Sequence, residues 1–300
     1  MIEIEASRPY ALAIHGGAGG PKTDGAAETL ASYHAGLRAA HEAGEKVLAD
    51  GGPALEAVIA AVQALEDDPI FNAGRGAVLS ADGRAELDAS VMTGDGRAGA
   101  VAVSRHARHP VDLARAVMER TPHLLLVDPP QSLLEEWGIE QAGQDWFVTE
   151  PRIAQLRRLQ KANAHITHGT VGAVARAADG RLAAATSTGG MANKANGRVG
   201  DSPIIGAGTW ARDGVVAVSC TGVGEAFMAG VVAHDVYARM AYGGLGLAAA
   251  AEATVARELR AVEAMGALIA VDADGRIVVA MNSDTMLAAW RDGDEVVTRI

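Results

Sequence analysis

The chain has 300 residues, with 26 basic and 37 acidic side chains, which give a formal net charge of −11. This acidic balance argues against nucleic acid or an anionic membrane as the main partner, because both require a basic surface. Hydrophobic residues make up 49 % and charged residues 21 % of the chain, a ratio that excludes wholesale disorder.

The single cysteine, Cys220, excludes an intrachain disulfide and a zinc site made of several thiolates. It follows an apolar run, which predicts a buried and unreactive thiol. Residues 1–8 include charged side chains, and no apolar run approaches the roughly 18 residues of a membrane span. We therefore expect a cytoplasmic protein with no membrane partner.

The first part of the chain is predicted to form a buried strand and two helices. Residues 10–14 are apolar and predict the strand, which is followed by a glycine-rich loop at 15–20. A first helix is expected from Asp24, as its N-cap, to Gly51, and a second helix begins with Pro53 at its first position.

Asp-Gly pairs between alternating apolar segments predict tight hairpins, since both residue types tolerate the positive φ of such turns. They lie at residues 82–83, 95–96, 179–180, 213–214 and 274–275. Further helices are predicted by apolar spacing at 111–120, 225–241 and 247–262. Strand blocks that alternate with helix pairs predict an α+β fold with two largely antiparallel sheets between helix layers.

Residues 151–168 differ from the rest of this acidic protein, because they include four basic residues and no acidic one. Their polar composition and weak apolar period predict a solvated linker. Directly after it, Gly169 and Thr170 precede the apolar stretch 171–175, which predicts a buried strand.

The glycine-rich loop at 15–20 has two chemical interpretations beside a plain turn. It lacks the spacing of a dinucleotide-binding loop, and no P-loop motif occurs in the chain. An oxyanion loop of an α/β-hydrolase would need a G-x-S-x-G elbow, but Ser202 is followed by Ile204 where glycine is required. On its own, the loop therefore favours a plain turn.

Two pairs of histidines were considered as metal ligands, His34 with His41 and His106 with His109. Nothing near either pair supplies a third and a fourth ligand at zinc spacing. All four histidines are therefore predicted to be solvated.

The segment 186–225 carries the strongest chemical signal. Residues with small hydroxyl side chains stand next to glycines at 186–190 and 220–224. Such glycines expose backbone N–H groups that can hold an oxyanion. Arg198 and Asp201 could hold the carboxylate and the ammonium of an amino acid. They could equally form a surface ion pair of little energetic value.

Together these motifs resemble the plant-type L-asparaginase and isoaspartyl peptidase family of N-terminal-nucleophile hydrolases. The matching segments extend over nearly the whole chain, at residues 15–19, 71–74, 86–89, 168–174, 186–190, 197–203 and 221–225. The resemblance implies an αββα four-layer sandwich that forms a single domain over residues 1–300. It also implies autocatalytic cleavage between Gly169 and Thr170 into an α subunit 1–169 and a β subunit 170–300, with two such heterodimers paired.

The resemblance implies that Thr170 is the nucleophile and that its freed α-amine is the base. An α-amine titrates near 7.7–8.0, so part of it is neutral at physiological pH and able to accept the hydroxyl proton. Thr170 would attack the side-chain amide of L-asparagine or the isopeptide carbonyl of a β-aspartyl dipeptide, and water would then release aspartate.

Further roles carry over by motif. Thr188 would orient the nucleophile, and Thr221 with Gly222 would form the oxyanion hole. Arg198 would hold the substrate α-carboxylate and Asp201 its α-amine.

The remaining implied roles are more peripheral. Gly224 would add a backbone contact to the substrate, and Asn72 would lie near the active centre. No organic cofactor is implied, but a sodium ion would be held by backbone carbonyls of Leu65, Glu66, Asp68, Phe71, Ala73 and Arg75. Arg75 departs from the apolar residue common in relatives, and the short linker before Thr170 is expected to slow or modify processing.

Two alternatives stay open. A glycosylasparaginase of the same superfamily typically carries aspartate before the nucleophile, whereas Gly169 stands there in this chain. A non-catalytic amino-acid-binding protein would use Arg198 and Asp201 without turnover.

Overall fold

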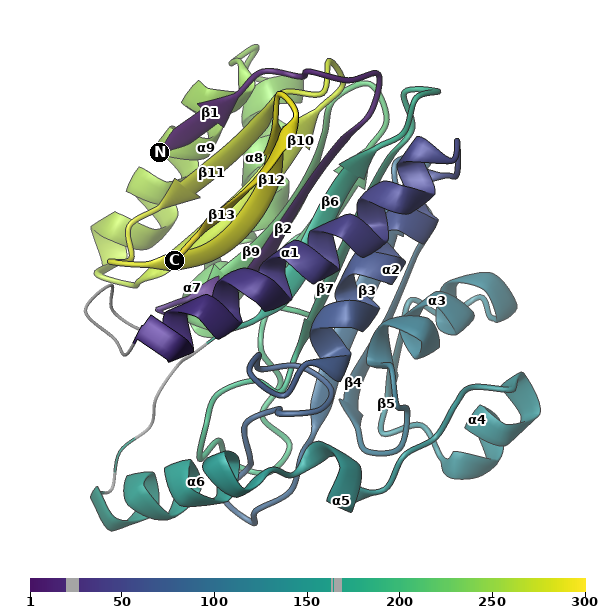
Figure 1. Ribbon diagram of the computed structural model, residues 1–300, viewed down its shortest axis with the longest axis vertical. Helices are drawn as coiled ribbons and strands as arrows, with labels where there is room; N and C mark the ends of the chain where they lie inside the picture. Colours follow the sequence, from purple (N-terminus) through teal and green to yellow (C-terminus); the bar gives the residue numbers. More distant parts are fainter. Residues whose placement is uncertain (20–26, 163, 165–168) are drawn as a thin grey trace.

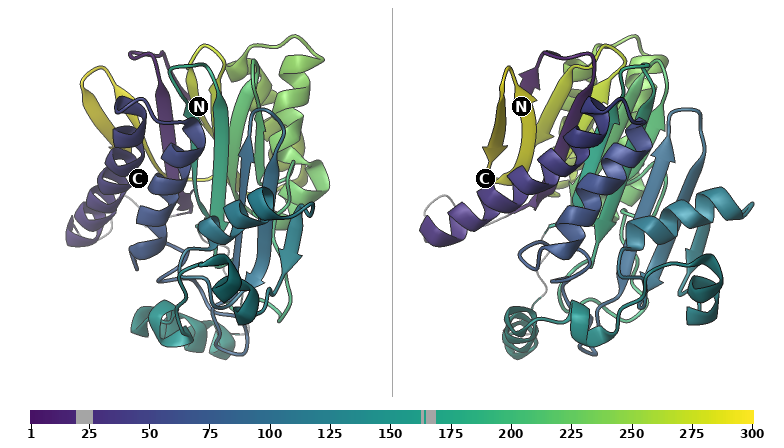
Figure 2. Two further views of the ribbon diagram at one scale, coloured as in Figure 1. Left: turned by 90° about the vertical axis from the view of Figure 1, so that its right-hand side faces the viewer. Right: turned by 45° about the vertical axis from the view of Figure 1, so that its right-hand side comes forward.

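The computed structural model describes residues 1–19, 27–162, 164 and 169–300. Two sheets lie face to face, and helices cover the outer face of each (Figure 1). In the left view of Figure 2, α1 and α2 lie on one side of the strands and the green helices α8 and α9 lie on the other. The predicted αββα four-layer sandwich is therefore confirmed.

The larger sheet has eight strands, of which only β4 and β5 pair in parallel. In spatial order they are β13 (Glu295–Arg299), β12 (Met286–Asp292), β2 (Ala11–Ala18), β6 (Val171–Arg176), β7 (Leu182–Thr188), β3 (Leu87–Thr93), β4 (Ala98–Ser104) and β5 (Leu125–Val127). The smaller sheet is antiparallel, in the order β1 (Ile2–Ile4), β11 (Ile277–Met281), β10 (Gly266–Asp272), β9 (Val216–Gly222) and β8 (Thr209–Arg212).

The helices form two outer layers and a group at one end of the molecule. The larger sheet is covered by α1 (Ala27–Ala49), α2 (Ala54–Asp67) and α3 (Pro110–Arg120). The smaller sheet is covered by α7 (Gly224–Gly230), α8 (Val232–Ala241) and α9 (Leu247–Thr254). The end group comprises α4 (Gln131–Trp137), α5 (Gln144–Phe147) and α6 (Glu150–Ala162). No helix in the described ranges is both long and apolar enough to cross a bilayer.

Each interface between layers has its own apolar cluster, because successive residues of a strand point to opposite faces of its sheet. Ile14 of β2 packs in the cluster beneath α1 and α2, whereas its neighbour Ala13 packs between the two sheets. Cys220 of β9 is buried beneath the helices of the smaller sheet, which confirms the expectation of a buried thiol.

The predicted Asp-Gly turns are confirmed, and four of them reverse the direction of the chain between neighbouring strands. The turns at 95–96, 179–180, 213–214 and 274–275 join β3 to β4, β6 to β7, β8 to β9 and β10 to β11, all antiparallel pairs. The turn at 82–83 lies between Leu79 and Ala85, which form an isolated antiparallel β-bridge.

The glycine-rich segment is a strand rather than a loop up to Ala18. Its backbone pairs with β12, with His15 opposite Ala288 and Ala18 opposite Met286. The prediction of a loop over 15–18 was therefore wrong, because pairing with β12 overrides the weak strand preference of glycine. Gly20 and the expected N-cap Asp24 lie outside the described residues.

The predicted solvated linker is largely a helix. Residues 151–162 belong to α6, whose Leu156 and Leu159 are buried against apolar clusters that include Phe147 and Val78. Two leucines separated by three positions are enough to bury one face of a short helix, although the other positions are polar. Residues 163 and 165–168 lie outside the described part of the chain.

The two later helices are interrupted within their predicted ranges. Val231 adopts a left-handed conformation with φ of 47°, which divides 225–241 into α7 and α8. After α9 the chain continues as one π turn at Val255–Leu259 and one 3₁₀ turn at Arg260–Val262.

The prediction of solvated histidines was wrong for His41 and His109, which are both buried. His41 donates from Nε2 to the carbonyl of Leu12 at 3.3 Å, and Nδ1 of His109 lies 3.2 Å from a Glu66 carboxylate oxygen. These partners come from other elements, so the spacing of the histidines along the chain does not indicate them.

The packing of α1 provides a test of the outer layer. Leu37 is fully buried in the cluster shared by α1, α2 and the larger sheet. We predict that Leu37→Ala lowers the free energy of unfolding by about 2–5 kcal/mol, because it removes buried methyl groups and leaves a cavity. Leu124→Ala is the matched control, since Leu124 is 52 % exposed. Urea unfolding followed by circular dichroism measures both; equal losses would contradict the packing.

Candidate active site

Thr170 lies at the start of β6, where the ends of β2, β7 and β9 come together. Its Oγ1 donates to Oγ1 of Thr188 at 3.2 Å, and its backbone N–H donates to Oγ1 of Thr221 at 3.2 Å. Gly169 precedes it with φ of 62°, a left-handed conformation that glycine adopts without strain. Both atoms that the proposed cleavage uses, the hydroxyl oxygen and the peptide nitrogen, are therefore held by hydroxyls of other strands.

Thr188 is itself fixed by the loop that follows β7. Its Oγ1 accepts the N–H of Gly190 at 2.9 Å, and the carbonyl of Gly190 accepts Nδ2 of Asn72 at 2.8 Å. The Asn72 carbonyl accepts the N–H of Gly189 at 3.1 Å, and a Cβ on Gly189 would lie 2.7 Å from Oδ1 of Asn72. Asn72 therefore supports the loop that carries the orienting hydroxyl.

The side chain of Thr221 is fully buried beside Thr170. Its Oγ1 accepts the N–H groups of Ala18 and Thr170, both at 3.2 Å. A hydroxyl has two acceptor positions and one proton, so the proton of Thr221 remains for donation to an oxyanion. Gly222 lines the same cavity as Thr170, and its φ of 151° together with a predicted Cβ contact of 2.5 Å to Gly266 requires glycine there.

Arg198 and Asp201 line that cavity too, together with Gly169, Thr170 and Thr188; it offers about 20 Å³ to solvent. The ion partner of Arg198 is Glu225, whose two carboxylate oxygens accept Nε and Nη2 at 3.0 Å each. The interpretation of Arg198 and Asp201 as a simple surface pair was therefore wrong. A carboxylate already occupies the fork of Arg198, which is the chemistry that a substrate α-carboxylate would offer.

Asp201 is a buried carboxylate with an unsatisfied oxygen. Burial raises its pKa to about 7, although nearby Arg198 lowers it. Oδ2 has no hydrogen-bond partner among the residues that the structure describes, and a buried carboxylate without a partner favours a cation beside it. A Cβ on Gly224 would lie 2.9 Å from both Nη2 of Arg198 and Oδ1 of Asp201, so the Gly224 backbone borders both groups.

Two buried groups near the site had no role assigned from the sequence. Lys194 is fully buried and donates from Nζ to the carbonyl of Glu86 at 2.9 Å, and Asp88 lies close enough to favour its charge. Nε2 of His15 lies 2.9 Å from Oγ of Ser219.

Burial lowers the pKa of His15 to about 3, and a hydrogen bond with the Thr170 backbone opposes this only in part. His15 is therefore neutral at physiological pH and supports the backbone of the nucleophile. Its place at the end of a strand, before two glycines, is the one sequence signal for such a role.

The turn after α2 contains the carbonyls expected to hold sodium. Leu65 and Glu66 lie in the last turn of α2, where carbonyls lack partners within the helix and the helix dipole is negative. Two of the expected carbonyls already accept hydrogen bonds: that of Glu66 from the N–H of Arg75 at 2.7 Å and that of Asp68 from the N–H of Phe71 at 3.2 Å. The guanidinium of Arg75 stacks on Trp146, 4.8 Å from the ring centroid, which accounts for a charged residue there. In the described ranges no cluster of three metal-binding side chains occurs.

Comparison with known proteins identifies the family of this chain. The family model described as Asparaginase matches residues 8–300. Isoaspartyl peptidases of Salmonella typhimurium and Escherichia coli are 47 % and 44 % identical, over 93 % of this chain and 94 % and 92 % of theirs. The isoaspartyl peptidase/L-asparaginase of Homo sapiens is 39 % identical over 94 % of this chain and 93 % of its own. The chain therefore belongs to the plant-type asparaginase family, the family of isoaspartyl peptidases and L-asparaginases.

Proposed function

We propose that this protein is an amidohydrolase that cleaves β-aspartyl dipeptides and L-asparagine with Thr170 as an N-terminal nucleophile. The observation that carries the proposal is the position of Thr170, between the hydroxyls of Thr188 and Thr221 and in one cavity with Arg198 and Asp201. The family and the names of its relatives support hydrolysis of these substrates.

The first step is cleavage of the chain between Gly169 and Thr170. Thr170 Oγ1 attacks the carbonyl carbon of Gly169; the new C–O bond forms an ester while the C–N bond breaks, and the hydroxyl proton passes to the nitrogen. Water then hydrolyses the ester, which leaves a carboxylate on Gly169 and a free amine on Thr170. The hydrogen bond from the Thr170 N–H to Thr221 holds the leaving nitrogen in place for this step.

Turnover uses the freed amine as the base. The amine takes the Oγ1 proton of Thr170, and the oxygen attacks the side-chain carbonyl of the substrate. Thr221 and Gly222 stabilise the oxyanion, and ammonia or an amino acid leaves with a proton from the ammonium of Thr170. Water, activated by the same amine, then cleaves the ester and releases aspartate.

Recognition depends on the two charged groups of the cavity. Asp201 accepts the substrate ammonium with its unsatisfied oxygen, and Arg198 binds the α-carboxylate once Glu225 has moved away. Gly224, whose backbone borders Arg198 and Asp201, contacts the bound substrate. L-Asparagine and β-aspartyl dipeptides share this end of the molecule, so both fit these groups.

The proposal extends to a sodium ion at the carbonyls that follow α2 and to a cytoplasmic enzyme of two paired αβ units. Exposed apolar side chains in the turns that border α7, α8 and α9 and in the segment before β10 support the pairing, because interfaces between subunits bury apolar surface. They are Val231, Tyr242, Leu245, Val262 and Met265.

The nucleophile is tested by its removal. We predict that Thr170→Ala remains one uncut chain and that its activity falls by about 10⁴-fold or more. Alanine has no hydroxyl to attack the Gly169 carbonyl, and without cleavage no free amine is formed. Thr170→Ser keeps a hydroxyl and should still be cut. Cleavage is measured by intact mass and N-terminal sequencing, and activity is measured by the release of aspartate. An active wild-type protein that stays uncut, or a cut Thr170→Ala variant, would refute the mechanism.

The ionisation of Asp201 predicts the pH dependence of binding. Because burial raises its pKa to about 7, Asp201 is largely neutral below that pH and binds an ammonium poorly. KM for L-asparagine should therefore fall about tenfold from about pH 6 to about pH 8. The charged groups that face Asp201 are Arg198, Glu225 and Asp88. Asp201→Asn should bind weakly at every pH, and a KM that is flat in the wild type would contradict this role.

Glu225 is predicted to compete with the substrate. We expect Glu225→Gln to lower KM for L-asparagine about threefold with little change in kcat, because Arg198 loses its internal carboxylate; the modest size reflects the exposure of Glu225. Glu252→Gln, which breaks the surface pair with Arg260, is the control. A higher KM in Glu225→Gln would show instead that Glu225 positions Arg198.

A further inference from the structure

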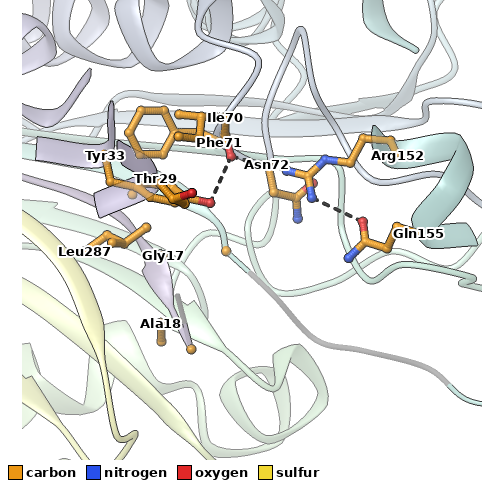
Figure 3. Close-up of a pocket in the computed structure, with 13 residues that line it drawn as sticks. Gly17, Ala18, Thr29, Tyr33, Ile70, Phe71, Asn72, Arg152, Gln155 and Leu287 are labelled. Atoms are coloured by element: carbon orange, nitrogen blue, oxygen red, sulfur yellow. Dashed lines mark hydrogen bonds between the residues drawn. The ribbon is translucent and has the colours of Figure 1, made fainter. Parts of the chain in front are cut away.

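A second cavity, of about 320 Å³, lies between β2, α1, α6 and the turn that contains Phe71 and Asn72 (Figure 3). Gly169 is the one described residue that lines both cavities. Its Cα is confined against β2, since a Cβ on Gly17 would lie 2.2 Å from it. The peptide that is expected to be cut therefore stands between the two spaces.

One wall of this second cavity carries a cation without an acidic partner. Arg152 of α6 donates from Nε to the carbonyl of Gly76 at 2.6 Å, from Nη1 to Gln155 at 3.1 Å and from Nη2 to the carbonyl of Ile70 at 3.4 Å. In the described part of the chain no carboxylate forms an ion pair with Arg152. Burial lowers the pKa of Arg152, as expected for a cation that no anion compensates, and Tyr33 opposes this.

The remaining donors of Arg152 are suited to a carboxylate. A guanidinium has five N–H groups, and the three hydrogen bonds leave one N–H uncommitted on each of Nη1 and Nη2. Such a pair can hold both oxygens of one carboxylate. Figure 3 shows Arg152 and Gln155 projecting from α6 toward Asn72.

Apolar groups make up much of the opposite wall, beside Thr29 and the hydroxyl of Tyr33. Phe71 and Tyr33 pack edge to face with ring centroids 5.7 Å apart, and Leu287 and Ile70 complete the surface. A volume of about 320 Å³ lies within the range of small-molecule sites. The cavity therefore suits a small molecule with one carboxylate and an apolar body.

The substrates of the proposed function, on which this step rests, differ in their leaving groups. L-Asparagine releases ammonia, whereas a β-aspartyl dipeptide releases an amino acid with a free carboxylate and a side chain. We propose that the second cavity is the subsite for this leaving residue: Arg152 binds its carboxylate, and the wall with Phe71 and Leu287 contacts its side chain. Cleavage opens the way between the cavities, because Gly169 is then no longer tied to Thr170.

A substrate pair tests the subsite in the unaltered protein. The dipeptide β-Asp-Leu and its C-terminal amide differ only in the carboxylate that Arg152 would bind. Wild-type enzyme should hydrolyse the free acid with at least about tenfold higher kcat/KM than the amide, mainly through KM. Equal rates on acid and amide would overturn the subsite alone. Failure to hydrolyse the dipeptides and L-asparagine would overturn the proposed function, and the subsite with it.

Variants of α6 assign the effect to Arg152. Arg152→Gln should raise KM for β-Asp-Leu about tenfold and remove the preference for acid over amide, while kcat/KM for L-asparagine stays within about twofold. Arg158→Gln is the matched control, since Arg158 lies exposed on the same helix. Rates are normalised to the concentration of Thr170 N-termini, because Arg152 also holds the Gly76 and Ile70 carbonyls.

Equal losses on L-asparagine and on the dipeptide in Arg152→Gln would show a purely structural role. An unchanged preference for the acid in that variant would show that Arg152 binds another carboxylate, such as the one left on Gly169 by cleavage. Either result overturns the proposal.

Discussion

The hydroxyl of Thr221 joins the two sheets at the residue on which the chemistry depends. It accepts N–H groups from Ala18 of β2 and from Thr170 at the start of β6, while Thr221 itself belongs to β9 of the other sheet. A single oxygen thus sets the distance between the sheets where the nucleophile lies. The same oxygen faces the peptide nitrogen before cleavage and would face the free amine afterwards.

Hydroxyl-bearing residues form a second connection between the sheets, beside the apolar cluster that fills the rest of that space. Beyond His15, a chain of hydroxyls connects Ser219, Thr186, Thr209 and Ser90 with successive distances of 2.6–2.7 Å. Each of these side chains is buried, so each depends on its neighbours for hydrogen bonds. Such a chain favours one register between the sheets, and this register brings β7 and β9 to Thr170.

Charge is distributed unevenly around Gly169. On the Thr170 side, Asp201 and Arg198 line one cavity, and Glu225 pairs with the arginine. On the other side, Arg152 faces an apolar wall without an acidic partner among the described residues. Gly169 therefore borders two cavities of different chemistry, and the bond that follows it is the one expected to break.

Local patterns in the sequence determined the turns, the strands on either side of them and the motif around Thr170. Asp-Gly pairs tolerate the positive φ of a tight turn, and alternating apolar positions indicate which face of a strand is buried, so these features need no distant partner. The pairing of Arg198 with Glu225, 27 residues away, and of Thr170 with Thr221, 51 residues away, was decided by tertiary structure. The helix at 150–162 was also decided by tertiary structure, because its burial depends on apolar residues that the rest of the fold brings to Leu156 and Leu159. Contacts between distant residues follow from how the layers pack, and no local preference of the backbone encodes them.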